Sequence, residues 1–472
     1  MHEPNNLIDK VVSLCKRRGF VYPGSEIYGG LANSWDYGPL GVELKNNIKN
    51  LWWKMFVHDR DDMVGLDAAL IMNPKVWEAS GHIKNFSDPL VECKKCHLRF
   101  RADHVNEVKD RNAGMTAMDF VSLPDDEKSI LVCKDSKTNE HEWTETKVFN
   151  LMLKTHLGPS EEKTNEVYFR PETAQAIFVQ FKNILGTSRM KPPFGVAQIG
   201  KAFRNEITPG NFIFRTREFE QMEIEYFIPA PTIDADWQKT FEEWKDAMWA
   251  WIDALGISRA NVEAVEISDT DRAFYSKRTI DFEYKYPFGQ KELYGLAYRT
   301  DYDLAQHEKF SGENLHYKDV NTGEDYLPHV IEPSLGVDRS FLAVLLDAYH
   351  EEGEGDKQRV VLKLKPVLAP YKVAVFPLLK NKPELVEKAR EIYTMLAHST
   401  SSGHAIGPIA WDDRGNIGKR YYAQDEIGTP YCVTVDFDTL EKGMVTVRDR
   451  DTMAQESVQI TDLRTYLNER VS

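Results

Sequence analysis

Cysteine is scarce in this chain, and long apolar runs are missing from it. The 472 residues include only 5 cysteines, too few for a disulfide framework, which favours a reducing compartment. No apolar stretch approaches the length of a membrane span, and the N-terminal residues lack the basic-then-apolar pattern of a secretory signal. We therefore expect a cytoplasmic protein with no membrane partner.

Net positive charge is lacking as well. The chain has 59 Lys and Arg against 74 Asp and Glu, which gives a net charge of −15. Sequence-independent affinity for nucleic acid requires positive surface, so composition alone does not suggest RNA binding, and RNA contacts would need local basic patches. The length predicts two or three domains, and 42% hydrophobic with 28% charged residues is typical of a globular protein.

The most informative segment is a charged hairpin. Residues 196–206 are expected to form one strand, 208–211 a turn and 213–227 the returning strand. Period-2 alternation gives the returning strand one polar face and one apolar face. The polar face would carry Arg215, Arg217, Phe219, Gln221, Glu223 and Glu225. This pattern is compatible with a solvated strand face, or with a nucleotide site in which arginines neutralise phosphates and Phe219 stacks on a base.

The hairpin resembles motif 2 of the class II aminoacyl-tRNA synthetases, through Phe203-Arg204-Asn205-Glu206 and the later Phe214-Arg215. A helix expected at 42–57 with an extended segment at 63–72 resembles motif 1. Residues 332–339, which precede an apolar helix through Tyr349, resemble motif 3. Finer features narrow the resemblance to the homodimeric type of glycyl-tRNA synthetase, from about Leu7 to the end of the chain. They are Gly29-Gly30, Trp35-Asp36-Tyr37-Gly38-Pro39-Leu40-Gly41, Arg170-Pro171-Glu172-Thr173-Ala174-Gln175 and Glu332-Pro333-Ser334.

The resemblance implies an α+β fold with two domains. A class II catalytic core with an antiparallel sheet would span 1–365, with insertions at about 91–143 and 230–285, and a C-terminal α/β anticodon-binding domain would span 366–472. Strand-like and helical segments alternate irregularly up to about residue 350, which agrees with an α+β core. An acidic, glycine-containing run at 351–356 and the prolines Pro366 and Pro370 indicate a linker. An amphipathic packing helix is expected at 234–255.

The resemblance implies the activity of a glycine–tRNA ligase. ATP would activate glycine to glycyl-adenylate, and glycine would pass to tRNA(Gly) with release of AMP and pyrophosphate. The glycine carboxylate attacks the α-phosphate directly, so the protein contributes position and charge rather than a nucleophile. The implied catalytic residues are Arg204 at the α-phosphate, Arg215 near the β- and γ-phosphates, and Arg339 on adenine opposite Phe219. The implied ATP-binding set is Arg204, Asn205, Glu206, Phe214, Arg215, Thr216, Arg217, Glu218, Phe219, Glu292, Leu293, Gly336, Val337, Asp338 and Arg339.

Glycine has no side chain, so a selective site must bind its ammonium and carboxylate and exclude larger residues by filling space. Carboxylates suit the ammonium, and Ser334 would close the pocket over the α-carbon. The implied substrate-binding set is Arg101, Glu172, Phe219, Glu220, Gln221, Met222, Glu223, Arg299, Glu332, Pro333, Ser334, Leu335 and Gly336. Magnesium is expected with ATP. Glu292 is the candidate ligand and Glu332 the alternate, although a surface or core-paired carboxylate would give the same pattern.

Cys93 and Cys96 form half of a zinc-binding pattern. Two more ligands would be needed, and the spacing of Cys133 and His141 is not that of a standard zinc knuckle. Related sequences carry a fuller set of cysteines here, so a metal-free remnant is favoured over bound zinc.

Homodimerisation is implied by motif 1. An apolar stripe there would serve a partner subunit or an intrachain core equally well; it comprises Leu44, Ile48, Leu51, Trp52 and Met55. Two other functions stay open. A non-catalytic relative could retain the fold as a binding module, but such proteins lose the motif arginines that this chain keeps. A synthetase for threonine, proline or histidine is disfavoured by Glu172 and Ser334.

Overall fold

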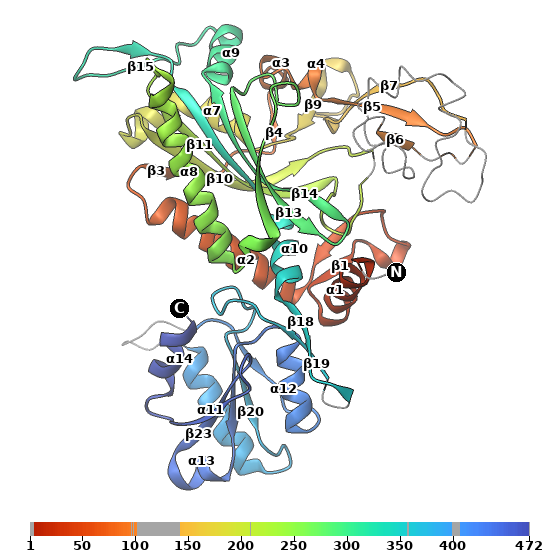
Figure 1. The fold of residues 1–472 in the computed structure, drawn as a ribbon, viewed down its shortest axis with the longest axis vertical. Helices are drawn as coiled ribbons and strands as arrows, with labels where there is room; N and C mark the ends of the chain where they lie inside the picture. Colours follow the sequence, from red (N-terminus) through yellow and green to blue (C-terminus); the bar gives the residue numbers. More distant parts are fainter. Residues whose placement is uncertain are drawn as a thin grey trace.

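The protein is built around two sheets with separate hydrophobic cores. The computed structural model describes residues 4–95, 97, 99–101, 142–207, 209–355, 358–398 and 406–471. The larger sheet and its helices form the upper part of Figure 1, and the smaller sheet forms the lower part. Within these residues, no helix combines the length and the apolar character that crossing a membrane requires.

The larger sheet has seven strands, and all neighbours run antiparallel except β10 and β3. A mostly antiparallel sheet covered by helices confirms the α+β prediction. The segment predicted as an insertion at 230–285 contributes to this sheet, since it supplies β12 and β13. In order across the sheet the strands are β12 (Val262–Glu266), β13 (Arg278–Tyr286), β14 (Gly289–Thr300), β17 (His329–Gly336), β11 (Glu218–Ile228), β10 (Phe194–Phe203) and β3 (Met63–Gly65).

Helices cover both faces of the larger sheet. The apolar side chains Met222, Ile224 and Tyr226 of β11 face the larger core, which they share with α1 (Pro4–Arg18), α2 (Pro39–Trp53), α8 (Asp234–Leu255) and α10 (Val337–Ala348). On the other face Phe227 packs with α7 (Ala174–Ser188) and α9 (Tyr302–Ser311). The packing helix predicted at 234–255 is confirmed as α8.

The apolar stripe of α2 belongs to this intrachain core. Leu44, Ile48 and Trp52 have no exposed surface, and Leu51 and Met55 pack against the same cluster. The helix continues into a single π-helical turn, Lys54–His58. The stripe therefore serves the intrachain core, and only its partly buried members Leu51 and Met55 retain exposed surface.

The returning strand of the charged hairpin starts later than predicted. Strand β11 begins at Glu218, whereas 213–217 form a turn and loop. Asn211 and Phe212 adopt positive φ values of 55° and 60°, and Gly210 and Arg215 pair across the turn. Phe212, Ile213 and Phe214 are all buried, so they do not alternate as a strand on a sheet surface would. The prediction of a strand from 213 was wrong because three successive apolar residues enter the core.

Smaller elements surround the larger sheet. One three-stranded sheet has the order β6 (Arg99–Arg101), β5 (Ser87–Glu92) and β7 (Lys147–Asn150). Its strands β5 and β6 come before the undescribed segment 102–141 in the chain, and β7 comes after it. Cys96, Cys133 and His141 of the zinc-binding hypothesis lie outside the described residues. The other elements of this part are β1 (Val21–Pro23), β2 (Trp35–Tyr37), β4 (Ile71–Met72), α3 (Pro74–Ala79), α4 (His82–Asn85), β8 (Lys154–His156), β9 (Glu166–Phe169), β15 (Tyr317–Lys318), β16 (Asp325–Tyr326), β18 (Tyr349–Glu352) and β19 (Arg359–Leu362).

The C-terminal part is an α/β unit with its own core. Strands β20 and β22 lie side by side in its sheet, and helix α11 connects them in the chain by way of β21 and α12. Strand β20 pairs in parallel with two neighbours, and the remaining pairs are antiparallel. The sheet order is β21 (Ile409–Trp411), β20 (Val373–Pro377), β22 (Tyr431–Val435), β23 (Met444–Asp449) and β24 (Gln455–Gln459), with helices α11 (Pro383–Ala397), α12 (Ile417–Asp425), α13 (Phe437–Lys442) and α14 (Leu463–Val471).

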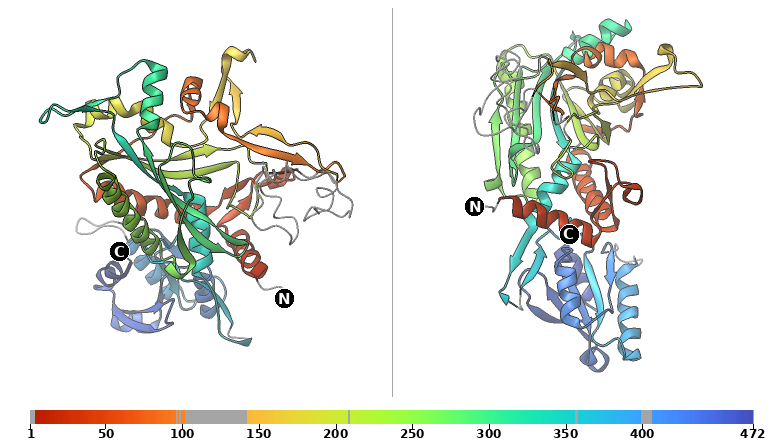
Figure 2. Two further views of the ribbon diagram at one scale, coloured as in Figure 1. Left: turned by 45° about the horizontal axis from the view of Figure 1, so that its top comes forward. Right: turned by 90° about the vertical axis from the view of Figure 1, so that its right-hand side faces the viewer.

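The linker between the two parts is held by specific hydrogen bonds. The side chain of Asn47 donates to the carbonyls of Leu368 and Ala369 at 3.1 and 3.0 Å. Lys372 Nζ donates to the carbonyls of residues 366, 367 and 369, and burial lowers its pKa to about 8. Helix α1 lies across the boundary (Figure 2), where Arg17 and Arg18 bond Glu426 of the C-terminal part.

Candidate active site

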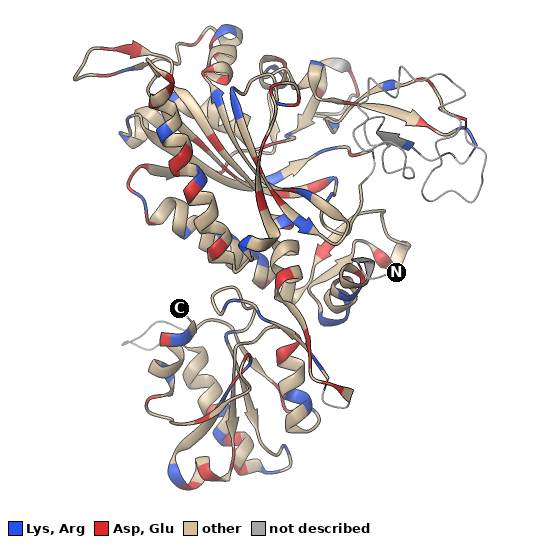
Figure 3. Cartoon of the chain, viewed as in Figure 1, with Lys and Arg blue, Asp and Glu red and all other residues tan. Residues whose placement is uncertain are grey.

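The polar face of β11 is buried, not solvated. Gln221, Glu223 and Glu225 are at most 7% exposed, and they follow Phe219 at intervals of two along the strand. A buried row of polar and ionisable side chains is costly unless it serves a site or is paired, which argues against the solvated-face interpretation. Both signs of charge are otherwise interspersed over the protein (Figure 3).

The Arg-Pro-Glu-Thr segment is anchored beneath this face by its own arginine. Arg170 is 1% exposed and donates to the carbonyls of Lys201 and Ala68 at 2.7 and 3.0 Å. A Cβ on Gly200 would come within 2.1 Å of the Arg170 guanidinium, so glycine is needed at that point of β10. The anchored segment in turn presents the carbonyl of Pro171 to Arg204 Nε at 3.0 Å. Arg204 is thereby oriented by main chain, without neutralisation of its charge.

One cavity, which we call the arginine cavity, has a volume of about 350 Å³ and is lined by Arg204, Arg215, Arg339, Phe219 and Glu292 among others. Arg339 Nη1 donates to the carbonyl of Glu292 and forms an ion pair with its carboxylate, each at 3.0 Å. The charge of Arg339 lowers the pKa of Glu292. Five carboxylates line this cavity as well, and Lys45 pairs with two of them, Glu220 and Asp338. The three arginines, rather than an excess of positive charge, are the groups that suit a polyphosphate.

Two of these arginines lie over aromatic rings that also line the cavity. The guanidinium carbon of Arg339 lies 4.6 Å from the ring centre of Phe214. The ring of Phe219 has Arg204 as its cation, at 5.2 Å. Phe219 and Arg339 nevertheless line the same cavity. An adenine ring would therefore enter between Phe219 and Arg339, which in this structure contact Arg204 and Phe214 respectively.

A second cavity, the carboxylate cavity, has a volume of about 240 Å³ and adjoins the first through Arg204, Gln221 and Ser334, which line both. Glu223 accepts hydrogen bonds from the Thr173 amide at 3.1 Å and from the Ser334 hydroxyl at 2.8 Å. Glu172 lies 3.2 Å from His82 Nε2. A concentration of negative charge in a small buried cavity suits an ammonium group.

Arg299 does not project its charge freely into the carboxylate cavity. Its side chain is 2% exposed, bonds Asp303 through Nε and Nη2 at 2.8 and 2.9 Å, and bonds Glu332 through Nη1 at 2.7 Å. The guanidinium also lies over the Tyr275 ring at 4.1 Å. Arg299 lines the carboxylate cavity and holds Glu332 there, and its contact with the glycine carboxylate stays a prediction.

The acidic groups of the carboxylate cavity titrate at different values. Burial acts to raise the pKa of Glu172, but His82, Arg299 and Arg204 lower it below the usual range. Burial, opposed by Arg299 and reinforced by Glu223 and Glu172, raises the pKa of Glu332 to about 8. Burial and the charge of Glu172 raise the pKa of Glu223. Such separation of neighbouring pKa values is typical of functional sites.

Comparison with known proteins agrees with this geometry. Residues 154–349 match the tRNA synthetase class II core domain (G, H, P, S and T), and residues 372–470 match the anticodon binding domain. The glycine–tRNA ligase of Clostridium acetobutylicum is 54% identical over 472 residues, which cover 98% of each chain. Those of Clostridium tetani and Lachnospira eligens are each 52% identical, with 98% of both chains covered.

The chain belongs to the glycine–tRNA ligase family. Most residues that this resemblance implied as ligands in the class II core line the two cavities. In the glycine–tRNA ligase core, the arginine cavity includes Glu206, Thr216, Glu220, Leu293, Gly336 and Asp338 in addition to the residues named above.

Some implied residues of the glycine–tRNA ligase core lie elsewhere. Met222, Leu335 and Val337 are 0–1% exposed and pack in the larger core, so only their main chain could contact a ligand. Asn205 and Pro333 line neither of the two cavities. Arg101 lies in β6, and its side chain is outside the described part of the chain.

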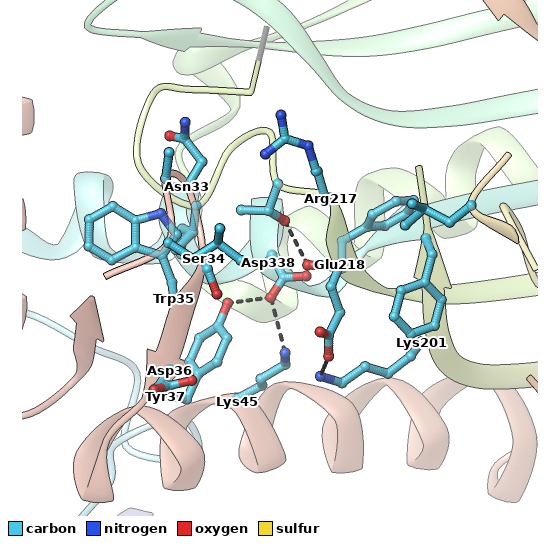
Figure 4. Close-up of a pocket in the computed structure, with 17 residues that line it drawn as sticks. Asn33, Ser34, Trp35, Asp36, Tyr37, Lys45, Lys201, Arg217, Glu218 and Asp338 are labelled. Carbon is cyan, nitrogen blue, oxygen red and sulfur yellow. Dashed lines mark hydrogen bonds and ion pairs between the residues drawn. The ribbon is translucent and has the colours of Figure 1, made fainter. Parts of the chain in front are cut away.

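Arg217 and Glu218 line a third cavity of about 500 Å³ behind the hairpin (Figure 4). Asp338 lines it too, and its carboxylate accepts hydrogen bonds from the Tyr37 hydroxyl, from Lys45 Nζ at 3.0 Å and from the Glu220 amide at 2.8 Å. Asp338 thereby joins β2, α2 and β11 of the family core. Its role is to hold the motif elements together beside Arg339.

Sequence reasoning missed several groups of the carboxylate cavity. Asp281 and Tyr275 line it, and burial together with the charges of Glu292 and Glu283 raises the pKa of Asp281 to about 7. His82 was missed as the partner of Glu172. The alternation of β13 could have placed Asp281 on a face with Thr279, but no local pattern indicates which strand lies beside it.

Proposed function

We propose that this chain activates glycine with ATP to glycyl-adenylate and transfers glycine to tRNA(Gly), releasing AMP and pyrophosphate. The observation that carries the proposal is the position of Arg204, which lines both the arginine cavity and the carboxylate cavity. An ammonium held among Glu172, Glu223 and Glu332 would place its carboxylate toward this boundary. There the α-phosphate of ATP would meet it, and Arg204 would stabilise the charge that develops in the transition state.

The proposed contacts divide between the two cavities. Arg215 and Arg339 would bind the outer phosphates and the adenine with Phe219. Ser334, whose hydroxyl is bonded to Glu223, would exclude a side chain larger than hydrogen. The retention of three arginines in one cavity disfavours a non-catalytic binding module, and the names of the relatives disfavour threonine, proline or histidine as substrate.

Magnesium fits this site at Glu292. The carboxylate of Glu292 is about half exposed (48%) and faces the arginine cavity, and Mg²⁺ usually combines one or two carboxylates with substrate phosphates. Bound magnesium would offset polyphosphate charge. Glu332 lines the carboxylate cavity and not the arginine cavity, where the phosphates would bind, which leaves Glu292 as the proposed ligand.

We also propose a homodimer, with residues 1–365 as catalytic core and 366–472 as anticodon-binding domain, in the cytoplasm. The family membership supports the dimer, and a surface other than the stripe of α2 would form it. The separate core of the C-terminal part and the pinned linker at 366–370 support the domain division. The shortage of cysteines supports a reducing compartment.

The function is tested by ATP–pyrophosphate exchange with glycine, alanine and serine. Wild type is expected to exchange with glycine alone. Glu172→Gln is expected to raise the glycine KM about 30-fold, since removing a buried charge opposite an ammonium costs on the order of 2 kcal/mol, while the KM for ATP stays within about twofold. Exchange with alanine equal to that with glycine, or an unchanged glycine KM in the variant, would refute the glycine assignment.

A further inference from the structure

Glu225 is a buried acid that the proposed reaction does not use. It has no exposed surface, lines neither of the two ligand cavities, and among the described residues no N–H or hydroxyl group donates a hydrogen bond to either of its carboxyl oxygens. An ionised carboxylate in that position would bear the full cost of desolvation without compensation. The side chain must therefore be a neutral carboxylic acid, or it must gain an interaction partner when a ligand binds.

The strand register places Glu225 beside the ammonium site. Glu223 pairs with Ser334 and Tyr226 with Ile331 across β11 and β17, so Glu225 lies opposite Glu332. Directly opposite residues of an antiparallel pair project from the same face, with Cβ atoms about 5 Å apart, and like charges in such pairs are destabilising. On its other side Glu225 faces Val196 of β10, which is apolar. Glu332 is therefore the carboxyl group that faces Glu225 across the two strands.

Only one member of this pair has a cation. Arg299 donates to Glu332 at 2.7 Å and so favours the ionised form of Glu332, whereas no arginine bonds Glu225 within the described chain. The other charged or titratable groups around the pair are Glu223 of β11, Glu172 before α7, Asp303 of α9 and Tyr275 of the loop before β13. Burial and the charge of Glu332 raise the pKa of Glu225 well above its usual value.

We propose that Glu225 is a positioning residue that stays a neutral acid and donates its proton as a hydrogen bond to Glu332, keeping Glu332 ready to receive the glycine ammonium. This inference rests on the proposed function and deepens it. When glycine binds, any proton on Glu332 leaves to solvent and the ammonium takes its place, while Glu225 keeps its own proton. The net change is one proton released for each ammonium bound to the protonated form.

The pH dependence follows from the raised pKa of Glu332. Below about pH 8 a growing fraction of Glu332 is protonated, and glycine binding must then remove that proton. The glycine KM should therefore fall as pH rises and level off above about pH 8. Without a donor at position 225, the ionised form of Glu332 loses a hydrogen bond, and its pKa should rise further.

Two replacements separate the roles that Glu225 could have. Glu225→Gln keeps shape and an N–H donor but cannot ionise, so its glycine KM in exchange should stay within about twofold of wild type at every pH. Glu225→Met keeps the side-chain volume without a donor. The pH above which the glycine KM no longer falls should therefore rise by about one unit, and the glycine KM at pH 7 should rise up to about tenfold. The KM for ATP should not change in either variant. Glu263→Gln, exposed on β12 of the same sheet, is the matched control.

Each contrary outcome overturns the proposal. A several-fold higher glycine KM in the Gln variant would mean that Glu225 is ionised and that its negative charge stabilises the bound glycine. Wild-type pH behaviour in the Met variant would mean that Glu225 only fills space. Infrared difference spectra without substrates provide a measurement independent of activity: wild type minus Glu225→Gln should show the carbonyl band of a protonated carboxylic acid at pH 7, and its absence would refute the neutral acid. Failure of wild type to exchange glycine at any pH would instead refute the proposed function.

Discussion

Replacement of Asp338 by alanine tests whether the motif elements are held together by one carboxylate. Asp338 is 7% exposed and accepts from three donors, the Tyr37 hydroxyl, Lys45 Nζ and the Glu220 amide. In the alanine variant Lys45 keeps Glu220 as a partner at 3.0 Å, so two donors lose their acceptor. At about 1–3 kcal/mol for each, the expected loss is about 2–6 kcal/mol, a range that includes the cost of about 3–5 kcal/mol typical of a broken buried ion pair.

The assay is urea unfolding followed by tryptophan fluorescence. All of the 10 tryptophans except Trp411 precede residue 366, so the fluorescence reports on the catalytic part. Asp338→Asn is the matched control, because its amide oxygen can still accept from the Glu220 amide, and it should lose about half as much free energy as alanine. The alanine variant should also show a higher KM for ATP, because Asp338 positions Arg339 and the strand end that carries Phe219. A loss below about 1 kcal/mol, or equal losses in both variants, would refute the reasoning.

Two further predictions concern the catalytic step and the domains. Arg204→Ala should reduce glycine-dependent exchange by about 100-fold or more with an unchanged unfolding midpoint, because a preorganised charge contact is worth roughly 3 kcal/mol to a transition state; near wild-type exchange would remove Arg204 from the mechanism. Truncation after Pro370, which retains the buried Leu368, should preserve glycine exchange but reduce tRNA charging, and unchanged charging by the folded fragment would refute the anticodon-domain assignment.

The arrangement of the motifs could be predicted from the sequence because each motif is local. The helix at 234–255 follows from its apolar period, and the polar face of β11 follows from alternation. Partners distant in the chain could not be predicted: Tyr37 and Asp338 are 301 residues apart, and nothing near either residue indicates the other. The same applies to Arg299, whose bonds to Asp303 and Glu332 no local pattern indicates. The loop at 213–217 was missed because its apolar residues fill the core irregularly.

The bonded linker has a consequence for how a long substrate would be handled. Asn47 of α2 and Lys372 both donate hydrogen bonds to main-chain carbonyls within 366–369. The linker is therefore fixed in one conformation at this point. The proposed catalytic core and anticodon-binding domain would then bind the two ends of a tRNA at a fixed separation, rather than as two domains joined by a flexible linker. The protein would discriminate against RNAs of the wrong length by geometry alone, before any base is read.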